Sequence, residues 1–340
     1  MGDRASNELT ALLKDTSRSF YLTLRVLPKP IRPQIGLAYL LARTTDTIAD
    51  TAVLPVGRRL QALEKLRDHI LGNSGTPPEF HELAEAQDWP AERALLERCG
   101  EMVALLAQTE AADRQRIREV LATIISGQEL DLKRFSDASA DNIVALADEA
   151  ELDDYTYRVA GCVGEFWTKM CWAHLFPDAL LEERPLQMKG VRFGKGLQLV
   201  NILRDLPVDL RNGRCYLPGK DLAAAKLAPR DLLDAENISK FRPLYEKYLA
   251  LAEAHLAVGW EYTNLLPRRF MRVRLACAWP IMIGVKTLAK LRAGNVLDDK
   301  QRLKVSRSDL RGMILRSVMW HPFPARWEKL VSFAKEDNRS

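Results

Sequence analysis

Glycine and proline are scarce in this chain, which has 18 and 17 of them among 340 residues. With 47% hydrophobic residues, the composition favours a large packed core. Long apolar runs are also missing, because the most apolar late stretch, 275–285, contains Pro280 and is too short to cross a bilayer. The first residues lack the apolar segment of a signal peptide. We therefore expect a cytoplasmic protein that is soluble or peripheral to a membrane.

Cysteine and net charge are low as well. The five cysteines are widely spaced and form no CxxC pair, which favours reduced thiols over a disulfide framework or a zinc site. The five histidines have no cysteine or carboxylate cluster beside them, so they suggest no metal or nucleophile role. A formal charge of +5 is too small over this length to indicate a nucleic-acid partner.

Apolar residues recur at three- and four-residue spacing through most of the chain, as in segments 59–72 and 244–266. This spacing is typical of amphipathic helices, and convincing strand alternation is absent. The breaks, such as 72–80 and 209–221, are too short to be flexible interdomain linkers. We predict an all-α fold in a single domain, residues 1–340.

Polar side chains form a stripe along the apolar segment 37–50. Tyr39, Arg43, Asp46 and Asp50 are spaced four, three and four residues apart, which places them on one face of a helix. A carboxylate is rarely buried without a positive partner, because removing its charge from water is costly. We therefore expect a cation at Asp46 and Asp50.

A second apolar segment repeats this arrangement. Gln198, Asn201, Asp205 and Asp209 are spaced three, four and four residues apart, and Arg204 adjoins Asp205. Internal salt bridges could explain both stripes, but buried ion pairs are weak devices for stability. Two aspartate pairs, each accompanied by an arginine, favour a binding function.

Carboxylates without histidine or cysteine suit magnesium, which is usually held by one or two carboxylates together with substrate phosphates. Two such pairs across a helical cavity predict a magnesium-bridged diphosphate, whose oxygens arginine can bind bidentately. Because the rest of these helices is apolar, the substrate fits a prenyl diphosphate. Pro207 predicts that the regular helix ends near Asp205, that Asp209 lies on a looser turn, and that a loop follows.

These residues resemble the squalene and phytoene synthases, head-to-head prenyl transferases, and the chain looks nearest to the bacterial squalene synthases. The resemblance covers roughly residues 17–311. It rests on "SRSF" (17–20), "YLLARTTDTIAD" (39–50), "YTYRVAGCVGEFW" (155–167), "GLQLVNILRD" (196–205) and "GRCYLP" (213–218). It implies a single-domain isoprenoid synthase helical bundle around a central hydrophobic cavity. Relatives often have DxxED in the second motif, whereas this chain has Val208 before Asp209.

The resemblance implies roles for individual residues. The expected magnesium ligands are Asp46, Asp50, Asn201, Asp205 and Asp209. Tyr155 matches a tyrosine that assists proton transfer during cyclopropane formation, and the four metal-binding aspartates are its catalytic partners. The expected substrate-binding residues are Ser17, Arg18, Ser19, Phe20, Tyr39, Arg43, Gln198 and Arg204. Gly161 and Gly164 follow Tyr157 at helical spacing, which suits either helix packing or a flat isoprene chain.

The resemblance further implies condensation of two farnesyl diphosphates to presqualene diphosphate, followed by an NADPH-dependent rearrangement to squalene. A basic tract that includes Lys304 and Arg307 occupies the position of a segment implicated in NADPH binding in squalene synthases. The tract could equally rest on acidic lipid. Trp320, Phe323 and Trp327 are candidate membrane anchors that could instead cap the core.

Other functions remain open. A phytoene or dehydrosqualene synthase would omit the hydride, and the choice of product depends on a pocket depth that one sequence does not measure. A non-catalytic assembly factor or prenyl-lipid binding relative is a further alternative, although such a protein would be expected to lose aspartates that are all present here. The oligomeric state is unknown.

Overall fold

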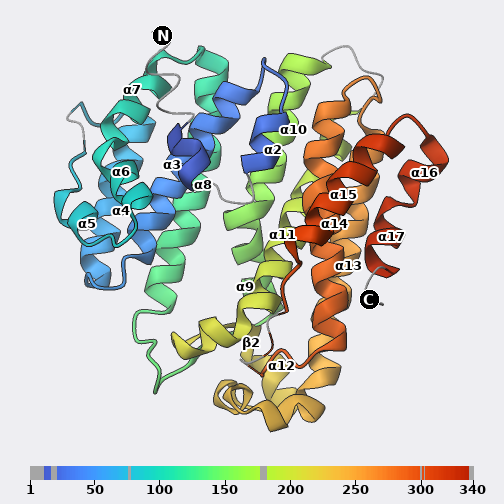
Figure 1. Ribbon diagram of the computed structural model, residues 1–340. Helices are drawn as coiled ribbons and strands as arrows, with labels where there is room; N and C mark the ends of the chain where they lie inside the picture. The colour runs from blue at the N-terminus through green and yellow to red at the C-terminus, as the bar shows by residue number, and fades with distance from the viewer. Residues whose placement is uncertain are drawn as a thin grey trace. The chain divides into compact units, whose positions relative to one another are not determined.

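The computed structural model describes residues 11–16, 21–75, 78–176, 182–298, 301 and 303–336. In these residues the regular structure is almost entirely helical, with one small two-stranded sheet (Figure 1). This confirms the predicted all-α class. The chain divides into two compact units, which we describe separately. A single domain over residues 1–340 stays a prediction.

The first unit contains the described residues up to Ser136 and those from Phe166 to Phe176. Its elements are α2 (Tyr21–Val26), α3 (Arg32–Asp50), α4 (Val56–Leu71), α5 (His81–Glu85), α6 (Pro90–Glu97), α7 (Cys99–Gln108), α8 (Ala111–Arg134) and most of α10 (Cys162–Leu175). The helices α3, α4 and α8 pack against one another. Their apolar stripes bury Leu41, Leu63 and Ile125 completely, which leaves the polar stripe of α3 outside this core.

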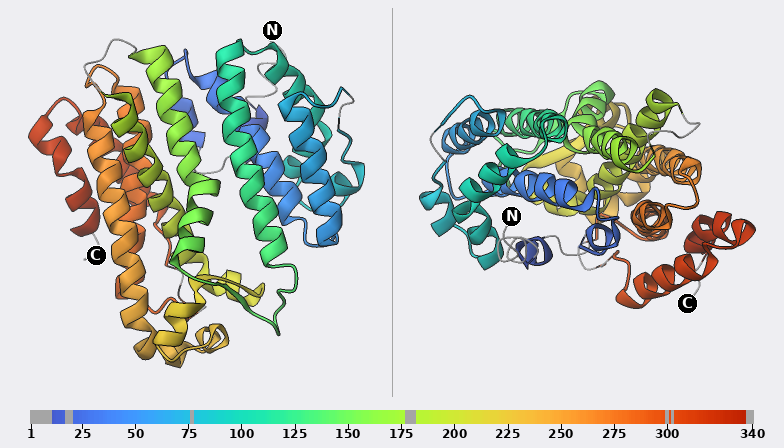
Figure 2. Two further views of the ribbon diagram at one scale, coloured as in Figure 1. Left: turned by 180° about the vertical axis from the view of Figure 1, so that it is seen from behind. Right: turned by 90° about the horizontal axis from the view of Figure 1, so that it is seen from above.

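The second unit contains residues Asp137–Glu165 and the described residues from Glu182 onward. Its elements are β1 (Val144–Leu146), α9 (Glu149–Thr156), the π-helix η2 (Tyr157–Gly161), α11 (Glu183–Arg211), β2 (Arg214–Pro218), α12 (Gly219–Ala224), the 3₁₀ helices η3 (Pro229–Leu233) and η4 (Ala235–Asn237), α13 (Ile238–Leu265), α14 (Met271–Ala293), α15 (Arg307–Trp320), α16 (Pro324–Glu328) and α17 (Leu330–Glu336). The long helices α11 and α13 lie side by side, and α14 contacts both (Figure 2). Leu203, Leu256 and Ile281 are fully buried among them.

Two glycines allow the start of α10 and the π-helix η2 to approach α11 at backbone distance. A Cβ on Gly164 would lie 1.9 Å from the carbonyl oxygen of Gly190, and one on Gly194 would lie 2.2 Å from that of Ala160. No side chain fits in either place, so Gly164 is required for helix packing. Of the two explanations open for this small-residue face, the structure supports close approach of a neighbouring helix at Gly164.

The segment after α11 differs from the prediction. Pro207 does not end the helix: α11 continues to Arg211, so Asp205 and Asp209 share one regular helix. The expected loop contains β2, which pairs in parallel with β1. Gly213 joins α11 to β2 at φ 76°, where a Cβ would lie 2.3 Å from the Ser139 amide nitrogen. The strand was missed because its pairing partner is about 70 residues earlier in the chain.

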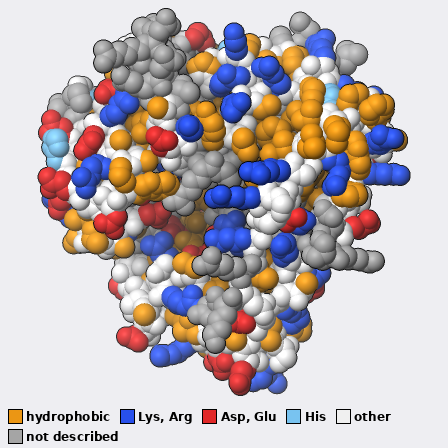
Figure 3. All heavy atoms as spheres, in the orientation of Figure 1, with side chains coloured by type: hydrophobic (Ala, Val, Ile, Leu, Met, Phe, Trp, Pro, Cys, Tyr) orange, Lys and Arg blue, Asp and Glu red, His pale blue; other side chains and the backbone are white. Residues whose placement is uncertain are grey.

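Of the three carboxyl-terminal helices, α15 and α17 pack on α14, and α16 packs on both of them. Their outward surface combines hydrophobic side chains with Lys and Arg, seen over α15 and α16 at the upper right of Figure 3. Among the residues that the structure describes, no helix has the length and apolarity needed to span a bilayer. The five cysteines are all buried and none of them forms a disulfide, as expected for reduced thiols.

Candidate active site

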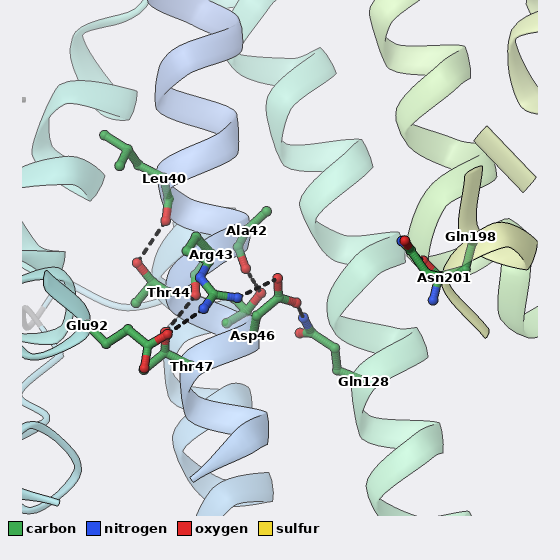
Figure 4. Close-up of polar contacts among 11 residues, drawn as sticks. Leu40, Ala42, Arg43, Thr44, Asp46, Thr47, Glu92, Gln128, Gln198 and Asn201 are labelled. Carbon is green, nitrogen blue, oxygen red and sulfur yellow. Dashed lines mark hydrogen bonds and ion pairs between the residues drawn. The ribbon is translucent and has the colours of Figure 1, made fainter. Parts of the chain in front are cut away.

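The α3 stripe lies on the polar side of a helix whose opposite side is in the first core. Asp46 is half-buried and Asp50 is exposed one turn later. Gln128 on α8 donates from Nε2 to Oδ1 of Asp46 at 2.6 Å. Arg43 lies 3.9 Å from Oδ2 of Asp46 through Nη1 and pairs through Nη2 with Glu92 on α6 (Figure 4). Asp46 therefore has a neutral hydrogen-bond donor and only a distant, shared cation.

The electrostatics of this stripe favour an added positive charge. Burial and then repulsion from Asp50 raise the pKa of Asp46 to about 7, although Arg43 and the Gln128 hydrogen bond act in the opposite direction. The Asp46 side chain still has 47% of its surface exposed, so a small ion can reach it. A cation bound by both carboxylates would offset their repulsion and favour the ionised form of Asp46.

The α11 stripe is neutralised differently. Arg204 donates from Nε to Oδ1 of Asp205 at 2.8 Å and from Nη2 to Oδ2, so one guanidinium binds both oxygens. This pairing raises the pKa of Arg204. Asn201 is exposed and donates from Nδ2 to Oε1 of Gln198 at 3.5 Å. A phosphate that binds Arg204 must therefore share the guanidinium with Asp205, and a metal ion that binds Asp205 must share the carboxylate with Arg204.

Tyr245 explains how α11 continues through Pro207. Proline has no backbone N–H, so the carbonyl oxygen of Leu203 four residues earlier lacks its helical donor. The hydroxyl of Tyr245 on α13 donates to this oxygen at 3.0 Å, in a fully buried position. Burial also raises the pKa of Tyr245, which keeps the hydroxyl protonated as a donor. The helix therefore stays regular between Asp205 and Asp209.

Tyr155 lies near the end of α9, two residues before the start of the π-helix η2. Its ring stacks on that of Tyr216 in β2, with centroids 4.7 Å apart and planes 24° apart. Tyr216 is 6% exposed, whereas Tyr155 is half-buried, so the buried ring supports the more accessible one. A π-helix often marks a functional segment, which agrees with the position of Tyr155 beside it.

The other predicted residues are distributed as follows. The "SRSF" residues Ser17, Arg18, Ser19 and Phe20 lie outside the described residues. Tyr39 is half-buried on the α3 stripe, and Lys304 and Arg307 are exposed before and at the start of α15. The roles assigned to these residues stay predictions.

Four partners of the site were missed by sequence reasoning: Gln128, Glu92, Tyr216 and Tyr245. One weak sign of Gln128 is present in the sequence, because this polar residue occurs at the spacing of the core residues of α8. In the structure it is 7% exposed. Its Oε1 is buried and has no hydrogen-bond partner within the described part of the chain. The other three become partners only through tertiary contacts.

Comparison with known proteins decides the family. The profile described as squalene/phytoene synthase matches residues 13–309. The chain belongs to the squalene/phytoene synthase family. It is therefore a prenyltransferase of the type that joins prenyl diphosphates head to head.

Several relatives have named activities. The presqualene diphosphate synthase of Rhodopseudomonas palustris is 30% identical over 75% of this chain and 77% of its own length. The presqualene diphosphate synthase of Zymomonas mobilis is 27% identical over 79% of each chain. The bifunctional lycopene cyclase/phytoene synthase of Colletotrichum graminicola is 30% identical over 76% of this chain, but the match spans only 42% of that longer protein.

Solved structures show the same fold. A complex of TcSQS with the ligand BPH1237 has a TM-score of 0.80 at 20% identity, covering 99% of this chain and 93% of the other. Squalene synthase HpnC from Alicyclobacillus acidocaldarius has a TM-score of 0.60 at 19% identity, covering 84% and 92%. The predicted all-α isoprenoid synthase fold is thereby confirmed.

The donor groups of both stripes fit magnesium. Among the described residues, no group of three or more His, Cys, Asp and Glu side chains is arranged to hold a metal ion. Magnesium does not require such a cage, because phosphate oxygens and waters complete its octahedron around one or two carboxylates. Asp46 with Asp50, and Asp205 with Asp209, are each two carboxylates one helical turn apart. Each pair can therefore hold magnesium together with a diphosphate.

Proposed function

We propose that this protein condenses two molecules of farnesyl diphosphate to presqualene diphosphate. The observation that carries the proposal is the pair of aspartate stripes on α3 and α11, in a chain similar to presqualene diphosphate synthases over most of their length. The apolar residues beside each stripe suit a hydrocarbon tail, and the carboxylates and arginines suit a metal-bound diphosphate.

The two stripes bind the diphosphates in different ways. On α3, Asp46 and Asp50 hold magnesium, and Arg43 binds phosphate oxygen through the donors that Glu92 does not occupy. On α11, Asn201, Asp205 and Asp209 hold magnesium, and Arg204 exchanges part of its pairing with Asp205 for phosphate. When bound, magnesium stabilises the negative charge of the departing diphosphate. Tyr39 and Gln198 lie one turn from these groups and contact the prenyl chain.

The reaction removes one diphosphate and one proton from two substrates as the cyclopropane ring closes. Tyr155 assists the transfer of this proton through its hydroxyl, and Tyr216 keeps the Tyr155 ring in place. The roles are chemically distinct, since a phenylalanine at 216 keeps the ring contact whereas a phenylalanine at 155 removes the reacting hydroxyl.

The conversion of presqualene diphosphate to squalene requires a hydride, and NADPH is the proposed donor. Lys304 and Arg307 are exposed cations that suit its phosphate groups. The basic tract runs from Lys290 to Arg307 and also includes Arg292, which instead pairs with Glu246 at 2.7 Å and with Glu253 at 3.1 Å. The exposed end of the tract is therefore the better candidate for the cofactor.

A phytoene synthase activity is the second candidate, favoured by the similarity to the bifunctional lycopene cyclase/phytoene synthases. It uses the same stripes and differs in the length of the prenyl chain. A dehydrosqualene synthase would use farnesyl diphosphate and omit the hydride.

A product assay distinguishes these functions. Purified protein receives farnesyl or geranylgeranyl diphosphate with magnesium, with and without NADPH, and the products are identified by mass spectrometry. We expect presqualene diphosphate from farnesyl diphosphate without NADPH, and squalene when NADPH is added. Dehydrosqualene regardless of NADPH, or phytoene from the longer substrate, would replace the proposal with the corresponding alternative. Consumption of neither substrate would favour a non-catalytic relative.

A further inference from the structure

An exposed apolar surface lies on α15 and the turn into α16. Leu315 is 61% exposed, Met319 and Phe323 are each 52% exposed, and Val318 is 40% exposed. Leu315, Val318 and Met319 are three and four residues apart, so they share one side of α15. We call these four residues the α15 face. Figure 3 shows the hydrophobic side chains of this region gathered together on the surface.

Contacts between α15 and α14 determine which side of α15 faces outward. Trp279 on α14 donates from Nε1 to Ser317 Oγ at 2.9 Å, and Ser317 is fully buried. The ammonium of Lys286 lies 2.9 Å from Asp309, and Met313 is buried on the same side. These contacts hold α15 against α14, so the α15 face is a fixed outer surface of the second unit.

Of the two roles open for Trp327, the structure supports packing in the core and not membrane anchoring. Trp327 is 2% exposed, stacks on Trp260 at 5.4 Å between ring centroids, and donates from Nε1 to Asn264 Oδ1 at 2.7 Å. It belongs to the core because the turn between α15 and α16 brings it back against α13. Phe323, by contrast, is exposed, and the guanidinium of Arg326 lies over its ring at 5.3 Å.

Basic residues outnumber acidic ones around the α15 face, although Glu328 at the end of α16 is also exposed. The basic residues of the described segment 303–327 are Lys304, Arg307, Arg311, Arg316 and Arg326. Asp309 is its single acidic residue, and it is paired with the buried Lys286. Arg268 and Arg269 are exposed on the turn between α13 and α14, and Arg272 is exposed in the first turn of α14. His321 at the end of α15 contacts the Trp327 ring at 5.1 Å between centroids, and the Arg274 guanidinium of α14 lies over the same ring at 4.7 Å. Burial, and then the charges of Arg274 and Arg268, lower the pKa of His321, which agrees with cations of this region lying near the end of α15.

We propose that the α15 face docks on an anionic phospholipid bilayer, with Leu315, Val318, Met319 and Phe323 entering the interface and Arg311, Arg316 and Arg326 binding lipid phosphates. Apolar burial and attraction to anionic lipid together determine such binding. A second copy of this chain fits less well, because a twofold contact through the face would bring Arg311 and Arg316 towards the same cations of the partner. This inference rests on the surface and not on the proposed reaction.

Vesicle flotation of the full chain tests this proposal. The vesicles contain phosphatidylcholine alone or phosphatidylcholine with phosphatidylglycerol. We expect binding to the anionic vesicles, weakened by raising the salt concentration, and little binding to the neutral ones. Leu315→Glu/Met319→Glu should reduce the vesicle-bound fraction about tenfold or more, and Arg311→Gln should weaken binding about fivefold.

Leu233→Glu is the matched control. Leu233 is also exposed, at 42%, and lies on η3 near the start of α13. Trp327, which follows the α15 face in the chain, contacts the other end of this 28-residue helix. The two ends of α13 are about 40 Å apart. The control should bind vesicles like the parent chain. Equal binding to neutral and anionic vesicles, no binding to either, or an equal loss in the control would overturn the proposal. So would a parent chain that is dimeric by sedimentation and becomes monomeric in the Leu315→Glu/Met319→Glu variant.

Discussion

The hydroxyl of Tyr245 on α13 donates a hydrogen bond to the carbonyl oxygen of Leu203 on α11, 3.0 Å away and fully buried. This oxygen lacks its usual helical donor, because the residue four positions later is Pro207, which has no backbone N–H. The second aspartate stripe therefore depends on a side chain from a different helix to keep its backbone regular.

Removal of this hydroxyl tests the dependence. Tyr245→Phe leaves a buried carbonyl oxygen without a donor, which should lower the free energy of unfolding by about 1–3 kcal/mol. We also expect kcat to fall, because Asp205 and Asp209 lie on either side of Pro207. Urea denaturation and steady-state kinetics measure the two effects. Tyr248→Phe is the control, because its hydroxyl donates to Asp221 instead of to α11. Equal loss of kcat in both variants would contradict the role of Tyr245 in the stripe.

The aspartates themselves should be essential for turnover. Asp46→Asn and Asp205→Asn each remove a charged magnesium ligand, so the rate of diphosphate release should fall about a hundredfold or more. Circular dichroism should remain that of the parent chain. Asp141→Asn, an exposed aspartate outside both stripes, provides the control and should retain its rate. Near-normal rates in either of the first two variants would rule out the metal assignment for that stripe.

The raised pKa of Asp46 makes the stability of the metal-free protein depend on pH. Its pKa is raised to about 7 in the folded chain from an ordinary value of 3.8, so between these pH values the folded chain binds more protons than the unfolded chain. Stability contributed by protonated Asp46 is therefore lost as the pH rises through about 7. Compared with Asp46→Asn, the parent chain should become progressively less stable from pH 5 to pH 8, as measured by urea denaturation in EDTA. A constant difference between the two proteins over this range would show that Asp46 does not titrate there.

Tyr155 and Tyr216 should respond differently to the same substitution. Tyr155→Phe should lower kcat about a hundredfold with little change in KM, because proton transfer is impaired while binding is not. Tyr216→Phe keeps the stacked ring and should be nearly normal, whereas Tyr216→Leu should lower kcat. Rapid quenching with detection of presqualene diphosphate follows the step directly. A large rise in KM without a fall in kcat for Tyr155→Phe would assign this residue to binding alone.

Lys286 and Asp309 form an ion pair that holds α15 on α14. Lys286 is 2% exposed, so Asp309→Asn removes a negative charge that neutralises a buried cation and should destabilise the protein by about 3 kcal/mol. Burial alone would raise the pKa of Asp309, but hydrogen bonds with Lys286 and Ser306 lower it. The stability from this carboxylate should therefore be present above pH 4 and lost as the pH falls further.

The double variant Lys286→Met/Asp309→Asn tests how much of the lost stability comes from the ion pair itself. It should recover part of the stability lost in Asp309→Asn, because the buried charge is removed together with its partner. Additive losses in a double-mutant cycle of urea denaturation would show that the two residues do not interact.

Local periodicity was enough to predict the helices and the members of each polar stripe. Residues three and four apart share a helix face whatever surrounds the helix, so Asp46 with Asp50, and Asp205 with Asp209, could be grouped from spacing alone. The five motifs along the chain, two of which lie at these stripes, were also sufficient to indicate the family, which the comparison over residues 13–309 confirms.

Tertiary structure decided the partners and the exposed faces. Gln128, Glu92, Tyr216 and Tyr245 reach their partners from other segments, and no spacing rule connects residues so far apart in sequence. The same holds for Pro207, whose effect on α11 depends on a donor from α13, and for Trp327, which the turn after α15 returns to the core. The sequence by itself determined which residues share a helix face, because that relation is local. Only the packing of helices against one another determined which of those faces are buried, which are paired and which remain open to a ligand or a membrane.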